Sequence, residues 1–172
     1  MREAVGPETS LAPTLVNPAS GTVVATVDLV VPPERAYRML VTAELERWWG
    51  SESTYQMREW NAELRVGGPW RVLVCFTGAE PLPASGKFLE FDAPRRIVQT
   101  RRYEWDHPRL GRRDTRVTYE LAPHRDGTRL TVVHEGFERL PDAAAEHAQG
   151  WQRVLGWLEG YARSLPEARG TS

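Results

Sequence analysis

The sequence predicts an α+β fold in which one antiparallel sheet wraps around a long C-terminal helix. Short strand-like segments are joined by short loops, two short helices follow the first clear strand, and a long amphipathic segment comes last. Short connections favour antiparallel pairing, because parallel strands need long crossover segments. A sheet and a helix that are each apolar on one side bury those sides against each other.

The length and composition indicate one globular domain with a sizeable core. The chain has 172 residues, of which 41% are hydrophobic and 26% are charged, and its formal net charge is -1. A charge so close to zero gives no general attraction to nucleic acid, so we expect no nucleic-acid partner. No run approaches the ~18 apolar residues of a membrane span. A secretory signal consists of a basic segment followed by an apolar run, and the sequence does not open with this pattern. We therefore expect a cytoplasmic protein.

The first clear strand follows an N-terminal arm. Residues 1–20 contain one glycine and three prolines without any hydrophobic period, so we expect a flexible arm there. Residues 22–31 alternate so that one face is apolar throughout, which is typical of a half-buried strand. The domain itself is then expected at residues 21–164.

Two short helices are expected after that strand. Pro33 suits the first turn of a helix, where the missing N–H costs little. Thr42 is a suitable N-cap for a second helix that ends near Trp49-Gly50.

Six further strands are expected between residues 55 and 137, separated by turns and loops that contain glycine or proline. Their ranges are 55–66 (with an irregularity near Asn61), 70–76, 86–91, 96–105, 116–121 and 128–137. The longer loops are then at 77–85 and 107–114.

The last element is a long helix that begins at Pro141. Its apolar residues recur at spacings of three and four as far as Ala162. Gly150, Gly156 and Gly160 each weaken the helix by ~1 kcal/mol relative to alanine. We interpret these glycines as points of close packing against the sheet. The tail at residues 165–172 is expected to be frayed.

The sequence contains no recognisable motif for catalysis or for a cofactor. It has no G-x-S-x-G, no P-loop, no G-x-G-x-x-G and no H-E-x-x-H. The single cysteine, Cys75, excludes an intramolecular disulfide framework and a Cys-based zinc site. The four histidines form no helical pair. We therefore expect no metal, no cofactor and no catalytic residue.

His134 is the histidine with two interpretations. It shares its strand face with Leu130 and Val132, the face that must meet the long helix. It is either an acid or base inside a pocket, with a pKa near neutrality, or a core histidine bonded to a neighbour. The sequence leaves both roles open.

The tryptophans predict a cavity. Seven are present, and a thin sheet on one helix has difficulty burying seven indoles without leaving a space between them. Arg101 shares its strand face with residues expected to point inward, so its guanidinium can enter this space and hold a carboxylate. The expected ligand-binding residues are Trp48, Trp60, Trp70, Arg101, Tyr103, Trp105, Tyr119, His134 and Trp151.

Several short motifs also occur in a characteristic order. They are Pro32-Pro33-Glu34-Arg35, Thr42 to Trp48-Trp49-Gly50, Arg65-Val66-Gly67-Gly68, Gly86-Lys87-Phe88-Leu89-Glu90 with Pro94-Arg95-Arg96, Thr128 to Val132 with His134, Gly136 and Phe137, and Gly150-Trp151. Over residues 22–163 the chain resembles the heat-shock-protein ATPase activator homologue family of the START-like (SRPBCC) superfamily. The resemblance implies a helix-grip fold: a seven-stranded antiparallel sheet around a long C-terminal helix, with an apolar cavity between them.

The expected function is the binding of a small apolar molecule, flat or lipid-like, in that cavity and without a cofactor. A cyclase or hydrolase that uses the same cavity is an alternative, with His134 or Arg101 assisting proton transfer. A co-chaperone-like module that stimulates a chaperone ATPase is a second alternative. A homodimer and a chaperone partner remain open.

Overall fold

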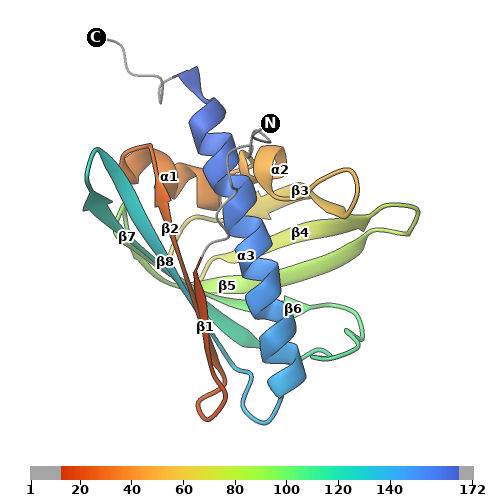
Figure 1. Cartoon of the computed structure of the whole chain (residues 1–172). Helices are drawn as coiled ribbons and strands as arrows, with labels where there is room; N and C mark the ends of the chain where they lie inside the picture. The colour runs from red at the N-terminus through yellow and green to blue at the C-terminus, as the bar shows by residue number, and fades with distance from the viewer. Residues whose placement is uncertain (1–12, 167–172) are drawn as a thin grey trace, which may run out of the picture.

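The structure is a computed structural model, and it describes residues 13–166 (Figure 1). Within these residues an eight-stranded antiparallel sheet curves around the C-terminal helix, so the predicted α+β helix-grip fold is confirmed. The strand order across the sheet is β1-β2-β8-β7-β6-β5-β4-β3. The elements are β1 (Thr14–Asn17), β2 (Thr22–Leu29), α1 (Pro33–Val41), α2 (Leu45–Trp48), β3 (Tyr55–Ala62), β4 (Pro69–Phe76), β5 (Leu82–Asp92), β6 (Arg96–Tyr103), β7 (Thr115–His124), β8 (Gly127–Glu135) and α3 (Pro141–Ser164).

Strand β1 corrects the expected N-terminal arm. Thr14–Asn17 pairs with β2, with Thr14 opposite Ala25 and Asn17 opposite Thr22. A four-residue edge strand is held by backbone hydrogen bonds and is too short to show an alternating pattern. The sheet therefore has eight strands among the described residues instead of seven. The rest of the arm, residues 1–12, and the tail from 167 to 172 lie outside the described residues.

The turn between β1 and β2 requires a glycine. Gly21 has φ 64°, and a Cβ at this position would lie 2.2 Å from the backbone nitrogen of Glu138. Only a residue without a side chain permits this close approach of the turn to the segment after β8.

Strand β5 begins earlier than expected. Leu82 and Pro83 belong to it, although the prolines of this segment indicated a loop. Proline is tolerated near the start of a strand because only its carbonyl is then needed for pairing. The carbonyl of Pro83 accepts a hydrogen bond of 2.9 Å from the backbone N–H of Glu104. The irregularity predicted near Asn61 is present as a register shift between Arg58 and Asn61.

Helix α3 crosses the concave face of the sheet and forms the core with it (Figure 1). Inward residues of β2, such as Val23, Ala25 and Val27, are buried, as the alternation predicts. The side of α3 that meets the sheet includes four alanines, which are small enough to allow close approach. Its buried residues are Ala143, Ala144, Ala148, Trp151, Val154, Leu155, Leu158 and Ala162.

A carboxylate ties the two short helices to α3. Arg35 in α1 donates hydrogen bonds to Glu44, which directly precedes α2, and Tyr161 in α3 donates to Glu44 Oε2 over 2.7 Å. The hydrogen bond from Arg35 is the main reason that the pKa of Glu44 is lowered. These hydrogen bonds hold α2, and with it Trp49, against the C-terminal half of α3.

The glycines of α3 do not pack closely against the sheet, so that interpretation is wrong. A Cβ added to Gly150, Gly156 or Gly160 would meet no heavy atom within 4 Å. The small buried residues on this side of the helix are its alanines. The glycines therefore weaken the helix without a packing reason.

Replacing Gly160 with alanine is expected to stabilise the fold by about 0.5–1 kcal/mol, because alanine favours a helix and its methyl group meets no neighbour here. Urea unfolding measures the change. Gly86→Ala is the contrasting variant: its Cβ would lie 1.9 Å from the carbonyl oxygen of Thr100, so it should destabilise strongly. A loss of stability in Gly160→Ala would contradict the open surroundings of this position.

Candidate functional site

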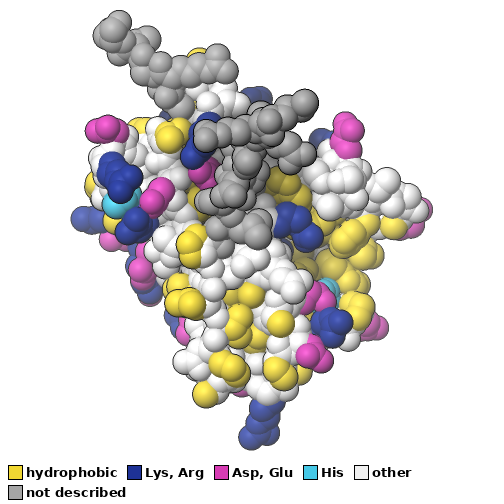
Figure 2. Space-filling view, viewed as in Figure 1, with side chains coloured by type: hydrophobic (Ala, Val, Ile, Leu, Met, Phe, Trp, Pro, Cys, Tyr) yellow, Lys and Arg dark blue, Asp and Glu magenta, His cyan; other side chains and the backbone are white. Residues whose placement is uncertain are grey.

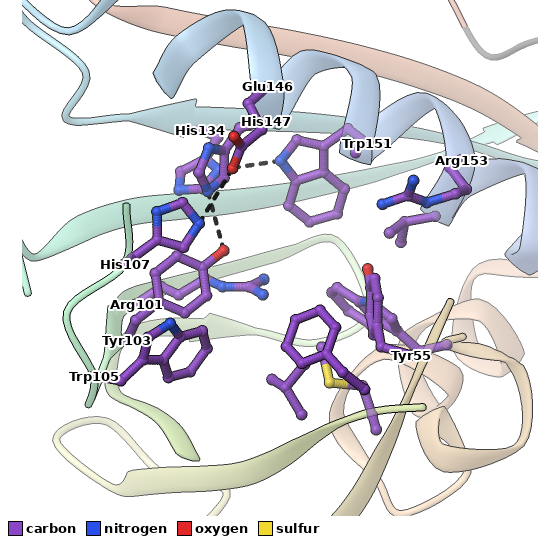
Figure 3. Close-up of a pocket in the computed structure, with 16 residues that line it drawn as sticks. Tyr55, Arg101, Tyr103, Trp105, His107, His134, Glu146, His147, Trp151 and Arg153 are labelled. Atoms are coloured by element: carbon purple, nitrogen blue, oxygen red, sulfur yellow. Dashed lines mark hydrogen bonds and ion pairs between the residues drawn. The ribbon is translucent and has the colours of Figure 1, made fainter. Parts of the chain in front are cut away.

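A cavity of about 170 Å³ lies between α3 and the β3–β6 half of the sheet. Figure 2 shows its surroundings as a group of hydrophobic side chains beside α3, with a histidine at the edge. Figure 3 shows the lining side chains at close range. They are Trp49, Tyr55, Met57, Val74, Phe76, Arg101, Tyr103, Trp105, His107, His134, Glu146, His147, Gly150, Trp151, Arg153 and Val154.

Five of the residues expected from the sequence line this cavity: Arg101, Tyr103, Trp105, His134 and Trp151. Strand β6 supplies Arg101 and Tyr103 from one face, as the alternation predicts. Trp151 approaches from α3, and His134 from β8. Sequence segments that are far apart thus meet at one place.

Three other expected residues lie away from this cavity. Trp60, Trp70 and Tyr119 line a second cavity of only about 20 Å³, which Arg101 also borders. The indoles of Trp60 and Trp70 stack on each other with ring centroids 5.5 Å apart. Each indole N–H already donates to a backbone carbonyl, of Val41 and Thr100 respectively. A space of this size has room for little more than one water molecule.

Trp48 lines neither of these two cavities, so the expectation that it borders the main one is wrong. It is 4% exposed and donates its indole N–H to the carbonyl of Met39 over 2.9 Å. Its neighbour Trp49 occupies the cavity wall instead. Two successive residues at the end of a short helix point in different directions, and the sequence does not show which one faces inward.

The structure adds residues that the sequence analysis missed. Tyr55 opens β3, His107 belongs to the loop after β6, and Glu146, His147 and Arg153 come from α3. His147 carried a usable signal, since it lies one helical turn before Trp151. Nothing in the sequence indicated that the loop of His107 folds back over the cavity.

His134 is held by two hydrogen bonds inside the protein. The indole N–H of Trp151 donates to His134 Nδ1 over 3.1 Å. The proton of the neutral ring must therefore be on Nε2, which donates to Thr115 Oγ1 over 2.8 Å. Thr115 in turn donates to the carbonyl of Arg101 over 3.2 Å. Burial, above all, lowers the pKa of His134 well below its ordinary value. This is the arrangement of a structural core histidine.

His147 is also neutral and fully engaged. Its Nδ1 donates to the carbonyl of Ala143 over 2.8 Å, so its Nε2 accepts the hydroxyl proton of Tyr103 over 3.0 Å. Burial lowers the pKa of His147 to about 4. Figure 3 shows how the tyrosine and the two histidines converge at one end of the cavity.

His107 covers that same end. Its ring stacks on Tyr103 with centroids 4.6 Å apart and an angle of 13° between the planes. Its Nδ1 accepts the backbone N–H groups of Arg109 and Leu110, so Nε2 carries the proton toward Glu146, 3.2 Å away. Burial lowers the pKa of His107 as well. The three histidines are therefore uncharged near neutral pH.

The described part of the chain offers no metal site and no membrane-spanning helix. Among residues 13–166, no three His, Cys, Asp or Glu side chains are placed to share a metal ion. Over the same residues, no helix has the length and apolar character needed to cross a bilayer. The histidine nitrogens near the cavity are instead used by neighbouring protein groups.

Comparison with known proteins identifies relatives of this fold. The sequence model of the family described as "Activator of Hsp90 ATPase homolog 1-like protein" matches residues 30–163. No curated protein matches the chain significantly.

Solved structures of similar fold come from several bacteria. A crystal structure from Chromobacterium violaceum is 29% identical, with a TM-score of 0.71, and the similarity covers 84% of this chain and 99% of that one. One from Rhodobacter sphaeroides is 20% identical, with a TM-score of 0.73 and coverages of 89% and 99%. A solution structure from Arthrobacter aurescens is 17% identical, with a TM-score of 0.78 and coverages of 92% and 95%. At the two lower identities the likeness shows the fold alone.

The depressed pKa of His147 predicts an acid-sensitive fold. The unfolded chain protonates this residue below about pH 6.5, whereas the folded protein does so only near the lowered pKa. The contribution of His147 to stability is therefore fully present above about pH 6.5 and is lost as the pH falls toward 4. At about pH 5 this residue lowers the free energy of unfolding by about 2 kcal/mol.

His147→Asn tests this, because Asn keeps a donor toward the carbonyl of Ala143 but does not titrate. Between about pH 7.5 and pH 5, the variant should lose about 2 kcal/mol less unfolding free energy than the wild type. Urea unfolding at both pH values provides the comparison. An equal loss in both proteins would show that His147 is not held neutral by burial.

Proposed function

The chain belongs to the Activator of Hsp90 ATPase homolog 1-like family, and from that premise we propose that it binds a small, flat, apolar molecule in the cavity beside α3. The observation that carries the proposal is the aromatic lining of a cavity with room for a ligand. Trp49, Trp105 and Trp151 form much of its wall. Flat aromatic walls offer a large contact area to a planar ring.

The size of the cavity favours a compact ligand. An engineered apolar cavity of about 150 Å³ binds benzene, and the volume here is about 170 Å³. One aromatic ring with a short substituent fits this volume. A longer apolar chain would have to extend through the open side of the cavity.

The surroundings of the histidines support binding more than catalysis. A general acid or base must exchange a proton with its substrate, and its pKa must lie near the working pH. Both ring nitrogens of His134 and of His147 are instead bonded within the protein, and burial keeps both rings neutral. The enzyme alternative would have to break these bonds first.

The proposal predicts that filling the cavity abolishes binding. Gly150 lines it, and a Cβ there meets no heavy atom within 4 Å, so Gly150→Leu should place its side chain in the space without a clash. Toluene should shift the indole N–H signals of Trp49 and Trp151 in NMR spectra of the wild type. In Gly150→Leu the affinity should fall by at least about tenfold.

Gly160→Leu is the matched control. It makes the same change in the same helix at a position that is equally open but outside the cavity. This variant should bind toluene as the wild type does. If toluene and a wider set of one-ring and two-ring arenes leave the wild-type signals unchanged, the proposed function is wrong.

A further inference from the structure

Arg101 is the unusual charge of this cavity. Its guanidinium extends from β6 toward the centre of the cavity, as Figure 3 shows. Among the described residues, its Nε is the one buried side-chain polar atom that has no hydrogen-bond partner in the protein. Leaving a buried donor on a charged group without a partner is costly, so native structures rarely contain one without a reason.

The immediate neighbours of Arg101 attract it without neutralising it. The guanidinium carbon lies 5.5 Å from the ring centroid of Trp49 and 5.7 Å from that of Tyr103. Aromatic rings stabilise a cation through their quadrupole, but they supply no anion and accept no strong hydrogen bond. Residues 13–166 provide no carboxylate in an ion pair with Arg101.

The acidic residue that lines the cavity is already paired with other residues. Glu146 is the one carboxylate among the described residues that line the cavity. Its Oε2 accepts from Arg109 Nε over 2.8 Å, and its Oε1 faces His107 Nε2 at 3.2 Å. The carboxylate is thus held at the cavity mouth by partners of its own.

A second arginine adds to the positive charge. Arg153 reaches the cavity from α3, where its guanidinium lies over the rings of Tyr55 and Trp157 at 5.7 and 5.5 Å. No carboxylate pairs with it among the described residues. Two arginines therefore face a cavity in which the one acid among the described lining residues is already paired and the histidines are neutral.

We propose that the ligand is an aromatic carboxylate, with its ring between the tryptophans and its carboxylate on Arg101. This inference rests on the proposed function and adds the chemical class of the ligand. A carboxylate can accept from Nε and a terminal nitrogen of one guanidinium at the same time, and this would satisfy the orphan donor. Pairing and burial together make such a contact stronger than one at the surface.

Three probes with the same ring separate the contribution of the negative charge from those of the polar group and the ring. They are benzoate, the uncharged benzamide, and toluene. At about pH 7.5 benzoate is fully ionised. Titrations followed by the indole N–H signals should give an affinity for benzoate at least about tenfold higher than for benzamide or toluene. Arg101→Met, which keeps an unbranched apolar stem and removes the guanidinium, should abolish this preference and leave the affinity for toluene within about threefold.

Two further arginine variants provide the comparison. Arg163→Met removes one positive charge from an exposed position of α3 outside this cavity, so the preference for benzoate should persist. Arg153→Met should reduce the preference for benzoate only in part. If Arg153→Met abolishes the preference and Arg101→Met does not, the assignment of the anchor to Arg101 is overturned.

The wild-type measurement decides the inference even where a variant fails to fold. If toluene and benzamide bind as tightly as benzoate, the aromatic-carboxylate proposal is wrong while the cavity function stands. If none of the three probes binds, the aromatic-carboxylate proposal is wrong, and the wider set of arenes decides whether the proposed function stands. A preference for benzoate in the wild type, lost in a folded Arg101→Met, is the result expected.

Discussion

The hydrogen bond from the indole of Trp151 to His134 Nδ1 joins the helix to the sheet at the place where both border the cavity. It sets the rotation of α3 about its own axis. With Trp151 turned toward β8, His147 one turn earlier faces Tyr103, and Gly150 faces the open space. Further hydrogen bonds continue from His134 through Thr115 to the backbone carbonyl of Arg101 in β6. The positions of Trp151 and His134 in the cavity wall therefore depend on one buried chain of donors and acceptors.

The cavity remains open because the elements around it cannot approach further. Trp49 and Trp151 lie with ring centroids 5.8 Å apart, and Tyr119 meets Trp151 edge-on at 6.2 Å. These three rings lie between the end of α2, the sheet and α3, while Gly150 contributes no side chain to fill the gap. Close packing is the rule in protein interiors, so a space of this size bordered by large side chains is uncommon.

The hydrophobic patterns and the turn and cap residues predicted seven of the eight described strands and the three helices, while the prediction of a cavity came from the tryptophans and the family resemblance. Alternation along β2 and β6, and the three-four spacing of α3, depend only on which face is buried. The wrong or missing predictions concern side-chain directions and a loop path, which only the three-dimensional structure defines. Neither the choice between Trp48 and Trp49 nor the approach of His107 over Tyr103 leaves a periodic trace in the sequence. The glycines of α3 were misread because a missing side chain indicates close packing and open space equally well.

The unpaired charge of Arg101 also connects ligand binding with the histidines. Burial is the main cause of the low pKa values of His134 and His147, and the positive charge of Arg101 lowers both further. An anion on Arg101 would cancel part of that field and so raise the pKa of each histidine. By linkage, protonation of a histidine must then strengthen the binding of the anion. Protonation of His134 also breaks its hydrogen bond from Trp151, because a charged ring has no acceptor nitrogen. Protonation thus favours the anion electrostatically but disturbs the aromatic wall against which the ring of the ligand would pack. The low pKa values keep the histidines neutral near neutral pH, so these opposing effects do not arise there.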